Sequence, residues 1–171
     1  GPLFNAAGEV IGINAQIRSD SGNAEGVGFA IPINTAGRSM EQLIQTGDVR
    51  YAWLGVTTQT VTPRIAERFG LAETSGAAVQ TVVGGSPADR GGLRGGSGEE
   101  EFEGLAFCPG GDVIVAIDDR PIQGAEDVVR AVNQQRFPGD EIRLTILRGN
   151  ERRELSVTLG DRPAKPPNLA C

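Results

Sequence analysis

The chain has 171 residues, 39% of them hydrophobic, and its 16 basic and 22 acidic residues give a net charge of −6. This is the composition of a soluble globular chain with one core domain and additional segments. Because the basic residues are scattered rather than gathered into a stripe, we expect no nucleic-acid partner. No stretch reaches the roughly 20 apolar residues that span a bilayer, and the first residues lack the features of a signal peptide.

The residue counts also restrict the chemistry. Twenty-five glycines and ten prolines predict many turns and short strands rather than a helical bundle. The chain has no histidine, the base that serine and cysteine nucleophiles most often use and a common zinc ligand. We therefore expect no catalytic triad within this chain, no metal site and no cofactor.

The two cysteines, Cys108 and Cys171, lack the spacing of metal ligands and can form at most one disulfide. A cysteine at the last position of a chain is rarely held at bridging geometry. The sequence therefore favours two free thiols and leaves the redox compartment open.

Residues 9–17 are rich in β-branched side chains and follow a turn at 5–8, which predicts a strand. A polar loop, 18–25, leads to a second strand at 27–31. Pro32 closes that strand because proline cannot donate a hydrogen bond to a sheet. These residues predict a β-hairpin.

A helix is expected over 35–46, capped by Asn34 and ended by Gly47. A hairpin and one short helix do not bury both faces of a sheet, and a lone hairpin is marginally stable in water. Residues 1–48 are therefore expected to be incomplete without a partner surface.

From residue 53 onward the predicted secondary-structure elements are more closely spaced, with strands and short helices in alternation. Thr62 and Ser86 each precede a proline, which favours a capped helix start at both places. Gly149 and Asn150 favour a hairpin turn, and the proline-rich tail from Pro163 is expected to be loose. The expected elements are strands at 53–60, 76–83, 111–117, 141–148 and 151–159, helices at 62–69, 86–91 and 125–134, and a turn at 118–121.

Residues 95–110 combine glycines with an acidic run and predict a mobile surface loop, since dense like charges repel and glycine resists ordering. A calcium site is the weaker alternative, because the acidic residues are adjacent rather than spaced around one ion. Phe102, Leu105 and Phe107 indicate that part of this loop docks on the domain.

Two segments near the start carry a family resemblance. Gly-Pro-Leu-Phe-Asn at 1–5 and Gly-Glu-Val-Ile-Gly-Ile-Asn at 8–14 resemble the segment that follows the catalytic serine in trypsin-like proteases of the HtrA/Deg family. That serine lies in a Gly-Asn-Ser-Gly-Gly-Pro-Leu run, and on this alignment it would precede Gly1 by two residues. Residues 26–32 are similar to the last strand of that family's protease barrel.

This resemblance implies that the first segment is part of a trypsin-like β-barrel. It also implies that Ile13, Asn14 and Ala15 line the wall of the specificity pocket in the complete enzyme. Ordinary strand residues of a barrel remain the alternative interpretation of these three positions.

Further along, the chain resembles the PDZ domain that follows the protease in the same family. The departure is the 95–110 insertion, where the family has only a few residues. The matching pieces are 51–56, 84–88, 110–114, 117–122 and 140–142.

The resulting fold class is mainly β with short helices. We expect a PDZ-type, partly open β-barrel or sandwich with two flanking helices, preceded by a hairpin and helix left from an incomplete trypsin-like barrel. The expected domains are the protease remnant at 1–48, the PDZ domain at 49–161 with its insertion, and a flexible tail at 162–171.

A PDZ groove works by strand addition: an extended peptide pairs with an exposed strand edge beside a helix. Here the strand is 56–60, and the glycine-containing bend before it offers backbone N–H donors to a terminal carboxylate. The small aliphatic wall of helix 125–134 implies a hydrophobic terminal residue. The expected peptide-binding residues are Trp53, Leu54, Gly55, Val56, Thr57, Thr58, Val128, Ala131 and Val132.

Each assignment has a structural alternative. Leu54 and Val56 are core candidates, and Val128 and Val132 belong to an amphipathic helix that buries one face whatever its function. Trp53 is alternatively a contact between the PDZ domain and the protease, or between subunits.

The leading hypothesis is a fragment of an HtrA-like serine endopeptidase whose PDZ module captures hydrophobic C-termini of misfolded proteins. The resemblance implies a bacterial, extracytoplasmic location and a trimeric parent protein, while the fragment alone is expected to be inactive. The alternative is a self-assembly or scaffold module, in which an unpaired strand edge pairs with another copy.

Overall fold

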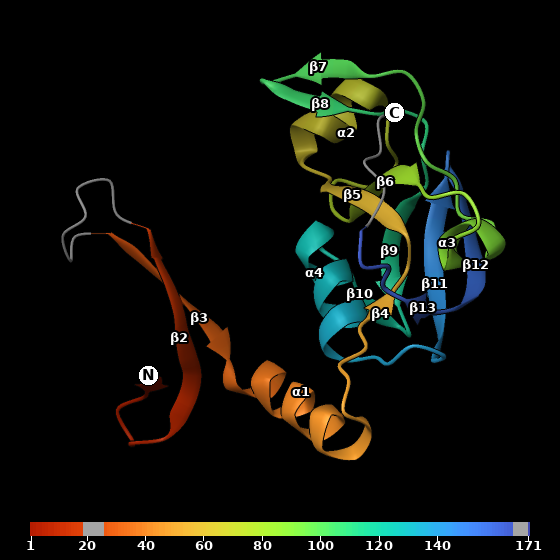
Figure 1. The fold of residues 1–171 in the computed structure, drawn as a ribbon. Coiled ribbons are helices and arrows are strands. Elements are labelled where there is room, and N and C mark those ends of the chain that lie inside the picture. Colours follow the sequence, from red (N-terminus) through yellow and green to blue (C-terminus); the bar gives the residue numbers. More distant parts are fainter. Residues whose placement is uncertain (19–25, 166–170) are drawn as a thin grey trace. The chain divides into compact units, whose positions relative to one another are not determined.

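The computed structural model describes residues 1–18, 26–165 and 171. The chain divides into two compact units, Gly1–Val49 and Arg50–Cys171 (Figure 1). The 18–25 loop and the proline-rich tail lie largely outside the described residues.

The first unit is a three-stranded antiparallel sheet followed by a helix. Its strands, in the order β1-β2-β3, are β1 (Pro2–Phe4), β2 (Val10–Arg18) and β3 (Val27–Pro32). The predicted hairpin is therefore present. β1 was not predicted, because three residues are too few for a recognisable alternation and it forms by pairing with β2.

The helix of this unit, α1 (Ile33–Thr46), ends as predicted and begins differently. Gly47 has φ 76° and its N–H donates to the Leu43 carbonyl, which ends the helix. Asn34, the predicted cap, lies inside the helix instead. Pro32 occupies the cap position without a side-chain hydrogen bond, because its extended backbone already sets the entry into the helix.

Apolar side chains of the first unit are exposed. Among its described residues only Gly12 is buried, and Ile17 and Ile44 are 71% and 77% exposed. The unit therefore forms no core of its own in the described residues, in agreement with the prediction for 1–48.

The second unit is built around one antiparallel sheet with the strand order β12-β11-β9-β6-β5, and β10 pairs with β9. The predicted strands and helices are present with ends shifted by a few residues. The strands are β4 (Ala52–Trp53), β5 (Val56–Thr60), β6 (Ala77–Val82), β7 (Glu100–Phe102), β8 (Leu105–Phe107), β9 (Val113–Ile117), β10 (Arg120–Pro121), β11 (Glu141–Arg148), β12 (Glu151–Thr158) and β13 (Gly160–Asp161), and the helices are α2 (Pro63–Phe69), α3 (Pro87–Arg90), α4 (Ala125–Val129) and the π-helical turn η1 (Arg130–Gln134).

Both predicted helix starts at a proline are confirmed. Thr62 Oγ1 accepts a hydrogen bond from the Ile65 N–H at 3.2 Å, and Ser86 Oγ accepts one from the Asp89 N–H at 3.2 Å. The hydroxyl caps one of the free amides of each first turn, and proline in the next position needs no hydrogen bond.

Three expectations for this unit need correction. The strand predicted over 53–60 is interrupted at Gly55, whose φ of 89° turns the chain so that β4 pairs with β13 and β5 with β6. The turn predicted at 118–121 includes the short strand β10. The helix predicted over 125–134 changes to π-helical geometry at Arg130.

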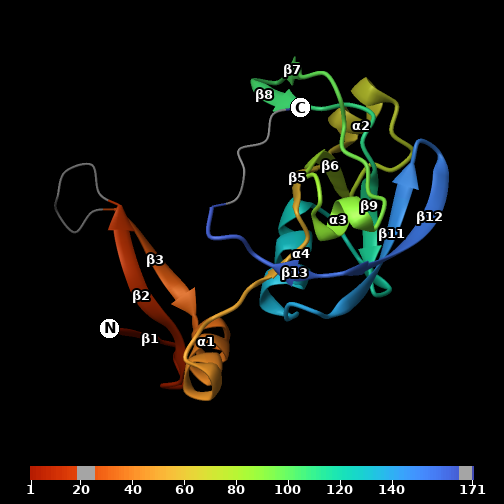
Figure 2. The same ribbon diagram turned by 45° about the vertical axis from the view of Figure 1, so that its right-hand side comes forward.

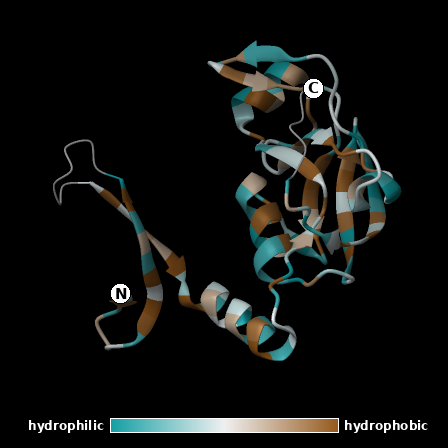
Figure 3. Cartoon of the chain, viewed as in Figure 1, coloured by the Kyte–Doolittle hydropathy of each residue, from teal (hydrophilic) through white to brown (hydrophobic). Residues whose placement is uncertain are grey.

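The core lies between the sheet and α3, α4 and η1. Hydrophobic residues gather along the central strands β9 and β11 (Figure 3), and Ile114, Leu144 and Ile146 are fully buried. The sheet remains open, because β5 and β12 at its two edges do not pair with each other.

A buried ion pair braces one end of this sheet. Asp112 is 1% exposed, and both of its oxygens accept hydrogen bonds from Arg148 at 2.8 Å. Asp112 also accepts from the Arg94 N–H at 2.8 Å, and Arg148 donates to the Gly92 carbonyl. The hydrogen bond that Arg148 donates to Asp112 raises the pKa of the Arg148 guanidinium above its ordinary value.

The 95–110 insertion contains an ordered hairpin, so the expectation of a mobile loop is wrong for β7 and β8. Phe107 stacks on Phe69 of α2 with ring centroids 4.4 Å apart, and Phe102 meets the same ring edge-on at 5.9 Å. Arg68 of α2 also pairs with Glu100 at 3.2 Å. The predicted docking is confirmed for both phenylalanines, whereas Leu105 is 60% exposed.

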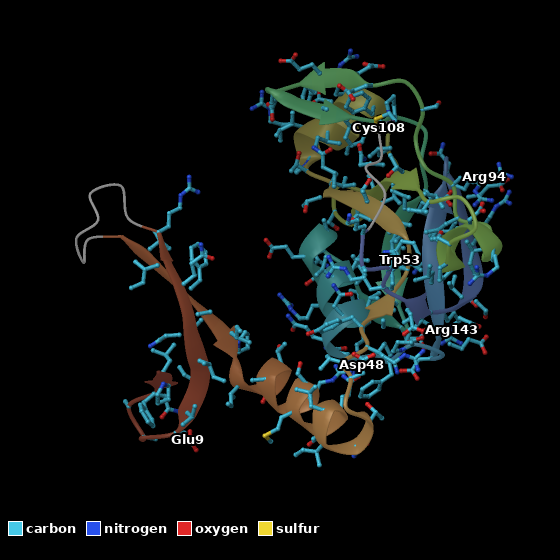
Figure 4. The ribbon with its side chains drawn as sticks, viewed as in Figure 1. Glu9, Asp48, Trp53, Arg94, Cys108 and Arg143 are labelled. Atoms are coloured by element: carbon cyan, nitrogen blue, oxygen red, sulfur yellow. A yellow bond between two sulfur atoms is a disulfide. The ribbon has the colours of Figure 1, made fainter. Side chains whose placement is uncertain are left out.

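The expectation of two free thiols is wrong: Cys108 and Cys171 form a disulfide with a Cα–Cα distance of 5.8 Å. Cys108 lies just after β8 (Figure 4), is 5% exposed, and its N–H donates to Gln80 Oε1 at 2.6 Å. The docked insertion therefore holds one thiol at a defined position. The disulfide attaches the end of the predicted flexible tail to the domain.

Replacing Cys171 with serine should lower the free energy of unfolding of the second unit. The cysteines are 63 positions apart, and losing a cross-link over such a loop costs about 2–4 kcal/mol. Urea denaturation followed by the fluorescence of Trp53, the single tryptophan, measures the change. Reductant should destabilise the unsubstituted chain by a similar amount and leave the variant unchanged; equal stability of oxidised and reduced chains would refute a stabilising role.

Candidate functional site

A groove runs between β5 and the helix formed by α4 and η1. β5 lies at the edge of the sheet, and among the described strands it pairs only with β6. Figures 1 and 2 show α4 alongside β5 in both views. The Ala125 N–H donates to Thr60 Oγ1 at 3.0 Å, which fixes the start of α4 against the end of β5.

At the other end of the groove, the bend before β5 directs its carbonyls into the domain. The Leu54 carbonyl accepts from the Ala88 N–H at 2.9 Å, and the Gly55 carbonyl accepts from the Val83 N–H at 2.9 Å. No described residue accepts a hydrogen bond from the N–H of Leu54 or Gly55. Unpartnered successive amides in a tight bend form an anion-binding concavity.

Only glycine fits at position 55. Its φ of 89° lies in the left-handed region, which disfavours other residues. A Cβ there would also lie 2.6 Å from Ser86 Oγ and 3.3 Å from the Trp53 indole. The bend can therefore keep this geometry only because residue 55 has no side chain.

The groove consists of two halves that share Val56, Thr58 and Val129 in their linings. The half next to the bend, of about 430 Å³, is lined by Trp53, Leu54, Gly55, Val56, Thr58, Val128, Val129, Val132, Asn133 and Arg162. The far half, of about 550 Å³, is lined by Val56, Thr57, Thr58, Ala125, Glu126, Val129, Arg130 and Gln134.

Eight of the nine residues proposed from the sequence line these two halves. Leu54, Val128 and Val132 are no more than 4% exposed, so they form the floor of the groove and part of the core at once. Ala131 is the exception, because it packs against the core and does not line the groove. Asn133, four positions after Val129, lines the groove instead.

Seven lining residues were not expected from the sequence, namely Ala125, Glu126, Val129, Arg130, Asn133, Gln134 and Arg162. Val129 lies in the helix pattern that indicated its neighbours. Arg162 lies beyond the expected end of the domain and reaches the groove because Gly160 pairs with Trp53 and the Arg162 N–H donates to the Tyr51 carbonyl at 3.0 Å. Only this strand pairing places it there, so no local signal indicated it.

The bend end of the groove has a positive side chain. Asp161 is paired with Arg50, whose Nε donates to it at 2.7 Å, and this hydrogen bond lowers the pKa of Asp161. The Asp161 carboxylate is therefore charged, and the positive charge of Arg50 already balances it. The neighbouring Arg162 guanidinium has no ion-pair partner among the described residues, so it adds an unmatched positive charge beside the free amides.

In the first unit, Asn14 and Ala15 of β2 line a separate hollow of about 540 Å³ together with residues of β3. The pairing of β2 with β3 shifts between Asn14 and Gln16, which makes Ala15 an extra residue in its strand. Ile13 pairs with Ile31 and does not line this hollow.

The part of the chain that the structure describes contains no group of three or more potential metal ligands. None of its helices is both long enough and apolar enough to cross a bilayer.

An open antiparallel sheet with a groove between an edge strand and a helix, entered beside a glycine bend, is the architecture of a PDZ domain. The profile of the PDZ domain family matches residues 52–159, and the chain therefore belongs to this family.

The similarity to HtrA/Deg proteins extends over the whole chain. It is 39% identical over 171 residues to a probable periplasmic serine endoprotease, DegP-like, of Ectopseudomonas mendocina, covering 100% of the chain and 33% of that relative. A protein of the same description from Brucella suis biovar 1 is 39% identical over 163 residues, covering 95% and 29%. The chain thus spans about a third of the length of these relatives.

Solved structures give the same result. The HtrA-type protease AlgW with a decapeptide superposes with a TM-score of 0.72 at 38% identity, covering 96% of this chain and 46% of that one. A serine endoprotease from Yersinia pestis superposes with a TM-score of 0.61 at 25% identity, covering 95% and 47%. The resemblance to HtrA/Deg proteases seen in the sequence is confirmed.

Proposed function

We propose that the groove binds the C-terminal ends of peptides whose last residue is hydrophobic. The single observation that carries this proposal is the pair of Leu54 and Gly55 amides, which have no acceptor among the described residues and lie beside an apolar trough on an edge strand. The C-terminal end of a peptide carries one carboxylate, which can accept hydrogen bonds from these amides and is attracted by the positive charge of Arg162.

The ligand adds to the sheet as a further strand. With its carboxylate at the bend, its chain runs from Thr60 toward Val56 and is antiparallel to β5. Four ligand residues then extend about 13 Å along β5. The last side chain enters the half of the groove floored by Leu54, Val128 and Val132, and the absence of charge on that floor favours an aliphatic or aromatic residue.

For the whole protein, we propose a periplasmic serine endopeptidase in protein quality control, whose PDZ module captures exposed ends of misfolded proteins. The names of the relatives, which describe periplasmic serine endoproteases, support this reading. The structure of AlgW with a decapeptide supports the peptide-binding role. Because it has no histidine, this chain alone would bind peptides without cleaving them.

Blocking the terminal carboxylate should weaken binding by about tenfold or more, since hydrogen bonds to a charged group contribute about 1.5–3 kcal/mol. Calorimetry compares a six-residue peptide that ends in valine with the same peptide amidated at its C-terminus. A third peptide with a free carboxylate and a terminal aspartate tests the apolar pocket and should bind weakly. Equal affinity of the free and amidated peptides would exclude the carboxylate site.

The free edge of β5 also supports a second candidate, pairing with another copy of the chain. In that case the ligand of the groove is a strand of the partner, and the chain is an assembly module. Light scattering over a dilution series distinguishes the two. A mass that stays monomeric at all concentrations would remove this candidate, whereas a dimer that the valine-ended peptide dissociates would support it.

A further inference from the structure

The disulfide joins two cysteines that the domain holds very differently. Cys108, at the base of the insertion (Figure 4), is 5% exposed, whereas Cys171 is an exposed residue. The Cys108 N–H donates to Oε1 of Gln80, which is itself buried. Among the residues that the structure describes, Cys171 has no bonded partner other than Cys108. One sulfur is therefore held by the domain and the other by the disulfide alone.

The contacts that position Cys108 do not involve the disulfide. The backbones of Gly96 and Cys108 pass so close that a Cβ on Gly96 would lie 1.9 Å from the Cys108 carbonyl oxygen. The Ser97 N–H donates to the Pro109 carbonyl at 2.9 Å, which closes the base of the insertion. Phe107, directly before Cys108, is 2% exposed in its stack on α2. Cys108 should therefore keep its place when the disulfide opens.

Access determines which sulfur an external thiol attacks. In thiol–disulfide exchange a thiolate approaches one sulfur along the line of the S–S bond, and the other sulfur leaves. Attack on Cys108 requires an approach through the buried base of the insertion, whereas attack on Cys171 takes place at an exposed residue. The geometry therefore favours Cys171 as the attacked sulfur.

We propose that Cys171 is a site of reversible modification by small thiols, with a preference for positively charged ones, and that Cys108 is the protected sulfur that restores the disulfide. The incoming thiolate forms a bond with Cys171 Sγ, the Cys108–Cys171 bond breaks, and Cys108 leaves as a thiolate that takes a proton from water. In the reverse step Cys108 attacks Cys171 Sγ and the small thiol leaves. Each step exchanges one disulfide for another, so no oxidant is consumed.

The preference for positive charge follows from the acidic run of the insertion. Of its four glutamates, Glu100 and Glu103 pair with arginines of α2. Glu99 and Glu101 have no ion-pair partner among the described residues. The antiparallel register of β7 and β8 places Glu99 at the level of Cys108. Two uncompensated negative charges therefore lie near the disulfide and repel anionic thiols.

Opening the disulfide also has a defined effect on the domain. The bond joins residues 63 positions apart, so it restrains the unfolded chain more than the folded one. The insertion stays docked on α2, because those contacts do not involve Cys171. The modified domain is therefore expected to stay folded and to unfold at a lower urea concentration.

A purely structural disulfide would behave differently. Its two sulfurs would become accessible only when the domain unfolds. Small thiols would then modify Cys108 and Cys171 alike, at a rate limited by unfolding. The two roles are separable by locating the bound thiol while the domain is folded.

The experiment exposes the oxidised full chain to cysteamine, 2-mercaptoethanol or 2-mercaptoethanesulfonate, which carry a positive, neutral or negative group. Acid quenching, tryptic digestion and mass spectrometry locate the bound thiol, and circular dichroism confirms that the domain is folded. At least about tenfold more thiol is expected on Cys171 than on Cys108. Relative to their rates with a neutral model disulfide, cysteamine should react about fivefold faster than the sulfonate at about 0.01 M salt.

Substitutions test the charge preference. Replacing Glu99 and Glu101 together with glutamine should remove it. The matched control replaces Glu141 and Glu154, which are exposed on β11 and β12, and should keep it. Raising the salt concentration to about 1 M should also remove it, because the screening length falls to about 3 Å. Equal normalised rates for the three thiols at low salt would refute the preference.

Single-cysteine variants test the accessibility of each sulfur. With Cys108→Ser, the remaining Cys171 should react with an aromatic disulfide reagent as fast as free cysteine does. With Cys171→Ser, the remaining Cys108 should react at least about tenfold more slowly. Equal rates in the two folded variants would contradict the protected position of Cys108.

Reversal is the final test, and it uses the unsubstituted chain. After removal of free thiol without air, the chain modified at Cys171 should release one thiol per molecule and regain the disulfide, because Cys108 attacks within the same molecule. The proposal is wrong if the modified chain keeps its thiol, if the thiol is found equally on both cysteines, or if modification occurs only in urea that unfolds the domain.

Discussion

Replacing Asp112 with alanine should lower the free energy of unfolding of the second unit by about 3–5 kcal/mol, the usual cost of removing one partner of a buried ion pair. Asp112 is 1% exposed and accepts hydrogen bonds from Arg148 and from the Arg94 N–H. Its loss leaves a positive charge without its partner next to the core and frees the segment before β7. Urea denaturation followed by Trp53 fluorescence measures the change.

A surface ion pair provides the control for this prediction. Glu151 and Arg153 are paired on β12 with side chains 70% and 47% exposed. Glu151→Ala should therefore change the free energy of unfolding far less than Asp112→Ala. Asp112→Asn keeps the shape of the side chain and should give an intermediate loss. If Asp112→Ala is no more destabilising than Glu151→Ala, the buried pair does not brace the sheet.

Replacing Gly55 with alanine should weaken binding of the valine-ended peptide by about 100-fold. Its φ of 89° disfavours a side chain, and the added Cβ would collide with Ser86. The bend must rotate to relieve both problems, which redirects the two amides that we propose as carboxylate donors. Losing two hydrogen bonds to a charged group at about 1.5 kcal/mol each gives this factor.

Gly149 in the turn between β11 and β12 is the matched control. It also has a positive φ, of 59°, but nothing lies within 4 Å of a Cβ placed there. Gly149→Ala should therefore lose stability through backbone strain alone and bind the peptide with unchanged affinity. Calorimetry on both variants, with circular dichroism to check folding, separates the effects. Unchanged affinity in a folded Gly55→Ala variant would remove the bend from the site.

Several features could be predicted because their causes are local. A threonine or serine before proline started α2 and α3, and Gly47 ended α1, since these residues act on the backbone next to them. The failures have a different origin. Asn34 was an equally good local cap, and the sequence carried no sign that the helix begins two residues before the predicted start, at Ile33.

The candidate site was predicted in part. The glycine bend and the helix opposite it were recognised from the order of the matching pieces. Ala131 was misplaced because the spacing of apolar residues does not show which of them line the groove and which only pack against the core. Arg162 was missed because its placement depends on a partner far away in the chain, Tyr51. The docking of Phe102 and Phe107 was predicted, but their partner Phe69 was not.

The amino-acid sequence by itself determined the kinds of elements, their order, the family resemblance and the glycine on which the bend depends, because each follows from nearby residues or a pattern along the chain. The tertiary structure alone decided that Cys108 meets Cys171 and that Arg162 borders the groove. The reason is physical: a cross-link and a shared surface are relations between distant segments, and the free energy of packing the whole domain selects them.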